Sequence, residues 1–405
     1  MPRSISTPRL VGALALLTTL ALGASACSGS SGSDAKVVQK ADMATSTAPG
    51  NDDQASSNAK TTSTTTDPSA APAGAKATGA AVPSAGCGTS TIKAVDAEKR
   101  TLPGSDRWYL LTTPPEHEGT TPLPLVVDYH GLSEGAELHA MFSGFGAYAA
   151  EHGFVLVAPN GTGTPVGWRV SPDRKANPDL VFTDRMLDQL EKDLCVDTSR
   201  VYATGLSNGA FVSSTLACSS ADRFAAVAPV AGLVDVDGCR PSRPVPILAF
   251  HGTADPLVLF NGGFGSRLGS VLSGQTGGAD PASTGSTTTE APLAAADLDG
   301  EGFPANAAAW AKRNGCTGEP SDTDLTPTVI ERTWDCPADA PVIFDIVQGG
   351  GHSWPGSEFS QKAENIVGPT DMSIDATDLI WTFFERFQLP KVDQADQADQ
   401  AEPAS

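Results

Sequence analysis

The sequence contains one serine whose neighbours suit nucleophilic chemistry. Ser207 lies within Gly205-Leu206-Ser207-Asn208-Gly209, between a short apolar run and a segment with helical periodicity. In a strand–turn–helix of this kind the two glycines permit a tight turn that exposes the serine oxygen, and the N-terminus of the helix favours developing negative charge. The motif therefore predicts that Ser207 is a nucleophile for acyl transfer.

A serine nucleophile needs a base that takes its proton and a third group that orients the base. In chains with this motif the acid and the histidine follow the serine in that order. Asp255 follows the apolar run PVPILAFHG, and His352 follows PVIFDIV and a run of three glycines. We therefore predict that Asp255 is the acid and His352 is the base.

Acyl transfer also needs N–H donors for the oxyanion. The backbone N–H of Asn208, directly after the nucleophile, is one expected donor. The second is the N–H of Leu132, which follows the run PLVVDY and a His-Gly turn. Trp168 and Trp354 lie in loops beside these strand ends, and each could either form a wall of the substrate pocket or pack in the core.

The other five histidines have contexts that favour structural roles. His130 is expected to stabilise its turn, and His251 is expected to be hydrogen-bonded beside the acid loop. The other three lie in a polar loop or on predicted helices, where we expect a solvated surface position: His117, His139 and His152.

The elements that must position these residues fall within one segment, about residues 87–390, where short apolar runs alternate with longer amphipathic ones. Strands are predicted over 108–112, 123–129, 154–158, 200–204, 225–231, 245–250, 329–334 and 342–347. Helices are predicted over 136–151, 179–194, 208–217, 304–314 and 374–387. Near-continuous apolar strands separated by helices imply a mostly parallel sheet covered on both faces, which is a doubly wound α/β fold. Ligands are then expected at the carboxyl ends of the strands.

The N-terminal segment has the features of an export signal. Arg3 and Arg9 precede an apolar run that is too short to span a membrane comfortably, and small residues follow it up to Cys27. Residues 1–26 are therefore predicted to be a signal peptide. Cys27 resembles the lipidated cysteine of bacterial lipoproteins, so we expect the protein to be extracellular and tethered to the membrane by lipid, or otherwise simply secreted.

Three further segments have low-complexity composition. Residues 27–86 are rich in Ser, Thr, Ala and Gly and are predicted to be a disordered tether, because they cannot bury enough apolar surface to fold. A similar stretch at about 262–296 is predicted to be a surface insertion, and residues 391–405 an acidic disordered tail.

The charge balance limits the classes of partner. The chain has 26 Lys and Arg against 47 Asp and Glu, which gives a formal net charge of −21. Nucleic acids and anionic membrane surfaces need basic side chains to neutralise phosphate. We therefore predict no nucleic-acid partner, membrane contact only through an N-terminal lipid, and a monomer that acts on a small-molecule or polymeric substrate.

Six cysteines remain after Cys27, an even number that indicates disulfides in an exported chain. The short loop between them favours Cys316 with Cys336. We pair Cys218 with Cys239, and Cys87 with Cys195, which would join the start of the folded segment to its centre. Free buried thiols are the alternative. The cysteines lack the spacing of a zinc site, and the sequence predicts no metal and no cofactor.

Several motifs resemble one known family. They are HGLSEGAELH, APNGTG, RVYATGLSNG, FAAVAPVAG, PVPILAFHGTADP, WAKRNGC, GGGHSWPG and IDATDLIWTFF. Together they resemble the secreted esterases that include poly(3-hydroxybutyrate) depolymerases, feruloyl esterases and acetyl xylan esterases, over about residues 87–390. The resemblance implies an α/β-hydrolase fold with the triad Ser207, Asp255 and His352. The low-complexity insertion and Ala210, where many relatives have a second glycine, depart from the family pattern.

Three functions are compatible with these features. The resemblance favours a serine esterase that hydrolyses carboxylic esters through an acyl-enzyme. The same triad would serve an acyltransferase that uses a cell-wall or lipid alcohol in place of water. An inactive hydrolase fold that serves as a binding module is the third alternative.

Overall fold

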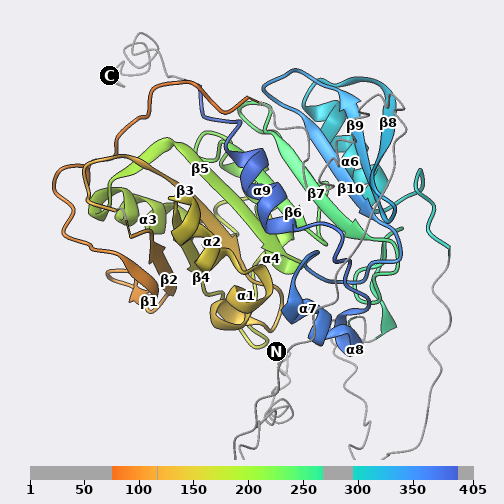
Figure 1. Cartoon of the computed structure of the whole chain (residues 1–405), viewed down its shortest axis with the longest axis horizontal. Helices are drawn as coiled ribbons and strands as arrows, with labels where there is room; N and C mark the ends of the chain where they lie inside the picture. Colours follow the sequence, from red (N-terminus) through yellow and green to blue (C-terminus); the bar gives the residue numbers. More distant parts are fainter. Residues whose placement is uncertain (1–74, 116, 267, 269–294, 391–405) are drawn as a thin grey trace, which may run out of the picture. The chain divides into compact units, whose positions relative to one another are not determined.

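The computed structural model describes residues 75–115, 117–266, 268 and 295–390 (Figure 1). The predicted signal peptide, Cys27, the acidic tail, and most of the predicted tether and insertion lie outside the described residues. Within the described part of the chain, no helix is both long and apolar enough to cross a bilayer.

A single ten-stranded sheet forms the centre of the fold, in the order β1-β2-β4-β3-β5-β6-β7-β10-β9-β8. The strands are β1 (Val95–Thr101), β2 (Trp108–Thr113), β3 (Leu123–Tyr129), β4 (Val155–Pro159), β5 (Val196–Leu206), β6 (Ala226–Val230), β7 (Ile247–Gly252), β8 (Thr317–Thr326), β9 (Val329–Asp335) and β10 (Val342–Val347). The run from β4 to β10 is parallel, and the outer strands on both sides pair antiparallel. All eight predicted strands are present.

Helices cover both faces of this sheet, because successive residues of each central strand point to opposite sides. Leu125 and Val127 of β3 pack with α3, α4 and α6, whereas Val126 packs on the other face with α1, α2 and α9. The helix bounds are α1 (Gly135–Ser143), α2 (Phe145–His152), α3 (Pro178–Asp193), α4 (Asn208–Ser219), α6 (Phe303–Arg313), α7 (Glu358–Lys362), α8 (Glu364–Val367) and α9 (Ala376–Phe384). The order and the two helical layers form the α/β-hydrolase fold that the sequence predicted.

One predicted helix is divided in the structure, and four elements were not predicted. The predicted helix 136–151 is divided at Gly144, whose φ of 65° ends α1 and begins α2. The edge strands β1 and β8 and the short helices α7 and α8 were not predicted. β1 and β8 are largely polar and exposed, so neither carries the apolar signal of a buried strand.

The folded segment begins before residue 87, although the disordered tether was predicted to extend to residue 86. The hydroxyl of Ser84 donates to the carbonyl of Leu194 at 2.7 Å, and its N–H donates to the carbonyl of Val196 at 2.9 Å. Disulfides join Cys87 to Cys195, Cys218 to Cys239, and Cys316 to Cys336, which are the three predicted pairs. The first of them fixes this N-terminal segment beside β5.

A buried carboxyl on β10 makes stability depend on pH. Asp345 is 1% exposed, and its Oδ1 has no hydrogen-bond partner within the described residues. Burial, and then the charge of Glu331, raises the pKa of Asp345 well above its ordinary value. The unfolded chain releases this proton above about pH 4 whereas the folded chain keeps it, so the carboxyl contributes stability that is lost as pH rises towards the folded-state pKa.

Replacing this carboxyl with an amide is expected to remove the pH dependence that it causes. Between pH 5 and pH 6, the free energy of unfolding of Asp345→Asn should rise relative to that of the wild type, by at most about 1.4 kcal/mol. Urea unfolding of both proteins at the two pH values measures this difference. If the difference in the free energy of unfolding between the variant and the wild type does not change with pH, Asp345 is ionised in the folded state.

Candidate active site

The predicted nucleophile lies at a strained turn between β5 and α4. Ser207 has φ 58° and ψ −116°, and its N–H donates to the carbonyl of Val230 at 2.9 Å. A positive φ is uncommon for a residue with a Cβ and places this serine outside the usual backbone regions. The structure therefore contains the tight, strained turn that the glycine-flanked motif predicted.

The two glycines that flank Ser207 leave room for one carbonyl group of β3. A Cβ on either Gly205 or Gly209 would overlap the carbonyl oxygen of Tyr129. The absence of side chains lets the start of α4 approach the end of β3 directly. This contact sets Ser207 beside the loop that follows β3, where Leu132 lies.

The predicted acid accepts hydrogen bonds with both carboxylate oxygens. Asp255, in the loop after β7, accepts from the N–H groups of Leu257 at 2.8 Å and Val258 at 2.9 Å through Oδ1. Its Oδ2 lies 2.7 Å from Nδ1 of His352 and 3.2 Å from Nε2 of His251. Burial alone would raise the pKa of Asp255, but His352, His251 and their hydrogen bonds hold this pKa well below its ordinary value. Asp255 is therefore a fixed carboxylate.

The predicted base is held by the loop after β10. The carbonyl of Gly350 accepts the N–H of Ala254 at 2.9 Å, and a Cβ on Gly252 would overlap Gly350 and Gly351. The glycine run thus brings His352 against the acid loop. Burial would lower the pKa of His352, but the charges of Asp255 and then Glu134 raise it.

Of the three predicted catalytic side chains, the structure brings Asp255 and His352 into direct contact. Because Nδ1 of His352 faces Asp255, Nε2 is the nitrogen left for proton transfer. Ser207 Oγ makes no hydrogen bond within the described residues. Contacts of this kind are often loose without substrate and tighten when substrate binds.

The side chains of the two residues predicted to supply the oxyanion donors approach the same glycine. A Cβ on Gly167 would lie 2.8 Å from Cδ1 of Leu132 and 2.9 Å from Oδ1 of Asn208. Neither backbone N–H of these two residues has an acceptor in the part of the chain that the structure describes. The Asn208 side chain is fixed by Trp168, whose N–H donates to Oδ1 at 2.7 Å and whose carbonyl accepts from Nδ2 at 3.1 Å.

The two predicted pocket tryptophans are both buried. Trp168 donates from Nε1 to the carbonyl of His130 at 2.8 Å and lies edge-on to Tyr129. Trp354 is 1% exposed and packs edge-on against Phe145. Trp354 therefore packs in the core, which is one of its two predicted positions. Trp168 contacts both the loop that carries Leu132 and the side chain of Asn208.

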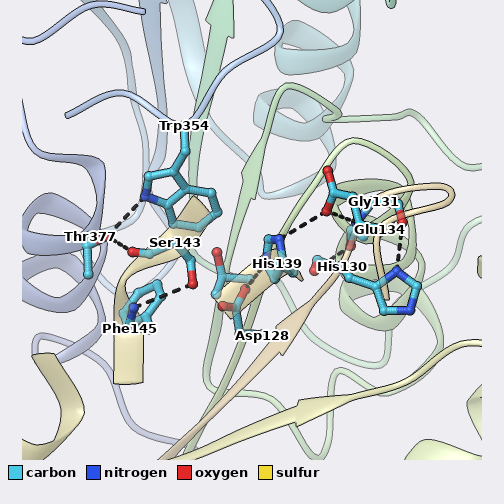
Figure 2. A network of polar contacts seen from close by, with 12 residues as sticks. Asp128, His130, Gly131, Glu134, His139, Ser143, Phe145, Trp354 and Thr377 are labelled. Carbon is cyan, nitrogen blue, oxygen red and sulfur yellow. Dashed lines mark hydrogen bonds and ion pairs between the residues drawn. The ribbon is translucent and has the colours of Figure 1, made fainter. Parts of the chain in front are cut away.

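Trp354 also joins two segments that are far apart in the sequence. Its Nε1 donates to Oγ1 of Thr377 at 3.0 Å, and the Thr377 hydroxyl donates to the carbonyl of Ser143, the last residue of α1, at 2.6 Å (Figure 2). The loop of His352 is thereby attached to the helix that follows the oxyanion loop.

Two histidines predicted at the surface are buried. His139 is 0% exposed because Asp128 and Glu134 surround its ring, and His117 is also buried. His152 is exposed and stacks on Tyr148, as expected for a surface residue.

His251 has the hydrogen-bonded position that the sequence predicted. Besides its contact with Asp255, its Nε2 donates to the carbonyl of Val258 at 3.0 Å. Sequence reasoning missed the group formed by Asp128, Glu134 and His139. Its signal in the sequence was Asp128, an acidic residue within an otherwise apolar predicted strand, followed closely by the motif HGLSEGAELH.

Comparisons with known proteins agree with this geometry. A family model described as the prolyl oligopeptidase family matches residues 141–244. The "Feruloyl esterase B" of Piromyces equi is 30% identical over 292 residues, which are 70% of this chain and 46% of that protein. The "Putative esterase NocK" of Nocardia uniformis subsp. tsuyamanensis is 31% identical over 262 residues, which are 63% of this chain and 72% of that protein.

A solved acetyl xylan esterase from Aspergillus awamori superimposes with a TM-score of 0.42 and 13% identity, over 66% of this chain and 97% of its own. Of the two relatives named above, the chain spans less than half of the Piromyces feruloyl esterase but nearly three quarters of the Nocardia protein. Similarity of that extent to the putative esterase, together with the sheet order, shows that the chain belongs to the esterase family of the α/β-hydrolase fold.

Proposed function

We propose that this protein is a serine esterase that hydrolyses carboxylic esters through an acyl-enzyme intermediate. The observation that carries the proposal is the 2.7 Å hydrogen bond between Nδ1 of His352 and Asp255, in a chain that also holds Ser207 at a strained turn. This bond fixes the imidazole tautomer in which Nε2 can accept a proton.

The reaction proceeds in two steps. Ser207 Oγ attacks the ester carbonyl while His352 Nε2 takes its proton, and the same proton then goes to the departing alcohol oxygen. Water next attacks the acyl-serine, again losing its proton to Nε2, which returns it to Ser207 as the carboxylic acid leaves. The carboxylate of Asp255 stabilises the imidazolium formed in each step.

The oxyanion of each tetrahedral intermediate is bound by the N–H groups of Leu132 and Asn208. Both groups lack a protein acceptor within the described residues, and both belong to residues that contact the same glycine position. Each such donor contributes about 2.7–4 kcal/mol to the stability of the transition state.

The substrate class that we propose is feruloyl esters or short hydroxyalkanoate esters, as in feruloyl esterases and polyhydroxybutyrate depolymerases. The name of the Piromyces relative supports the aromatic ester. The relatives are named esterases, which favours an ester over the amide that the prolyl oligopeptidase name suggests.

We also propose that the protein works outside the cell, attached by lipid on Cys27. Disulfides persist in oxidising compartments, and three are present here. The N-terminal sequence up to Cys27 supports export.

The test combines a substrate panel with covalent labelling of the full chain. We expect hydrolysis of p-nitrophenyl acetate, butyrate and octanoate and of methyl ferulate, and labelling by a fluorophosphonate probe at Ser207, located by mass spectrometry of the labelled peptide. Added alcohols should compete only weakly with water. Absence of both hydrolysis and labelling would contradict the proposal, and products formed mainly with the added alcohol would favour the acyltransferase.

A further inference from the structure

A second group of buried ionisable side chains lies beside the candidate site and has no part in the mechanism above. His139 of α1 is fully buried, and its Nε2 lies 2.7 Å from Oδ1 of Asp128, which is 1% exposed and lies on β3 (Figure 2). On the other side of the ring, Nδ1 lies 3.2 Å from Oε2 of Glu134, a contact that is an ion pair without hydrogen-bond alignment.

The imidazole in this group is charged at neutral pH. Burial alone would lower the pKa of His139, but the charges of Asp128 and Glu134 and the hydrogen bond to Asp128 raise it to about 10. The third ionisable group beside it, His130, is neutral, because burial lowers its pKa to about 4. Buried ion groups of this kind are often no more stabilising than apolar residues of the same size. Stability alone therefore does not account for this group, and the contacts of Glu134 indicate what else it does.

Glu134 fixes the first peptide of the oxyanion loop. Its Oε2 accepts the N–H of Gly131 at 2.7 Å, so one carboxylate oxygen contacts both this N–H and His139. A Cβ on Gly131 would lie 2.9 Å from the Glu134 carboxylate, so the glycine is what allows this approach.

His130 fixes the next peptide of the same loop. Its Nε2 accepts the N–H of Gly161 at 2.8 Å, so Nδ1 carries the proton and donates to the carbonyl of Gly131 at 2.7 Å. A peptide unit is planar and trans, so its N–H points opposite to its carbonyl. The direction of the Gly131 carbonyl therefore sets the direction of the Leu132 N–H, which is the proposed oxyanion donor.

We propose that Glu134, held in place by His139 and Asp128, is a positioning residue that fixes the oxyanion loop. The inference rests on the proposed esterase function and adds a second layer to that site. Glu134 contacts neither substrate nor Ser207 and acts through the Gly131 N–H.

The test compares two substitutions of Glu134 with a matched control. Glu134→Ala removes the acceptor for the Gly131 N–H, whereas Glu134→Gln keeps an acceptor and removes the charge. Glu137→Gln makes the same chemical change one turn later on α1, where the side chain is exposed and pairs only with Lys99 at the surface. All are compared in the full chain with p-nitrophenyl butyrate after melting curves have shown that each variant is folded.

We expect Glu134→Ala to lower kcat at least tenfold with KM nearly unchanged. The loss should stay below the roughly hundredfold to thousandfold cost of removing an oxyanion donor itself. Glu134→Gln should keep most of kcat and its KM, because the amide oxygen can still accept the Gly131 N–H. Glu137→Gln should match the wild type in both respects.

Each contrary result has a distinct meaning. A kcat of Glu134→Ala within threefold of the Glu137→Gln value, or a loss confined to KM, would overturn the positioning role. If Glu134→Ala does not fold, Glu134→Asp replaces it, because the shorter side chain keeps the charge and withdraws it from Gly131. A wild type that neither hydrolyses esters nor labels at Ser207 would instead refute the proposed function, and this inference with it.

Discussion

Replacing Ser207 with alanine is expected to lower kcat for p-nitrophenyl butyrate by about 10⁶-fold, the effect of removing the nucleophile of a serine hydrolase. Alanine keeps the Cβ, so the backbone at φ 58° is no more and no less strained than in the wild type. Ser207 Oγ donates no hydrogen bond within the described residues, so its removal breaks no hydrogen bond there. The melting temperature should therefore stay within a degree or two of the wild-type value while activity and probe labelling disappear.

Ser213→Ala provides the matched control on the same helix. The Ser213 hydroxyl is buried and donates to the carbonyl of Gly209 at 2.9 Å, within its own helix. We expect this variant to keep kcat within about twofold. Equal rates for the Ser207 and Ser213 variants would contradict the assignment of the nucleophile and would favour a binding module with no hydrolase activity.

Asp255→Asn is expected to lower kcat by about 10⁴-fold without unfolding the protein, the effect of forcing the wrong tautomer on a catalytic histidine. The amide oxygen would continue to accept the N–H groups of Leu257 and Val258, because both point at the same carboxylate oxygen. The amide NH₂ would then face Nδ1 of His352. A donor at that place favours the tautomer with its proton on Nε2, which cannot take the proton of Ser207.

The control for this substitution is Asp345→Asn, the same change at another buried carboxyl. Burial holds the pKa of Asp345 well above its ordinary value, which favours the neutral carboxyl that an amide resembles, so kcat at pH 7.5 should stay within about twofold. Initial rates and circular dichroism spectra of both variants separate a tautomer effect from unfolding. A kcat for Asp255→Asn within tenfold of the wild-type value would mean that another group orients His352.

The central sheet and the three proposed catalytic residues could be predicted because their signals are local. Buried parallel strands are continuous apolar runs, and the glycines around Ser207 and before His352 mark turns at the carboxyl ends of such runs. Asp255 was recognisable for the same reason, since it directly follows the strand that became β7.

The edge strands and the buried ion group could not be predicted from local patterns. β8 has the sequence TGEPSDTDLT, and it is a strand because its backbone pairs with β9, not because of its side chains. His139 counts as polar in any helical pattern. It is buried because two carboxylates from outside α1 compensate its charge, and only the folded chain brings Asp128 to it.

The hydrogen bonds from Trp354 through Thr377 to Ser143 have a consequence for how the site responds to heat. The second of these bonds spans 234 positions of the chain, and all three residues are buried. Neither the histidine loop nor the helix behind the oxyanion loop can fluctuate away alone without leaving a buried polar group unpaired, which costs about 1–3 kcal/mol. The base and the oxyanion donors therefore belong to one cooperative unit, whose amide hydrogens exchange with solvent in a common opening. Thermal inactivation should then be a single sharp step that occurs when this unit melts.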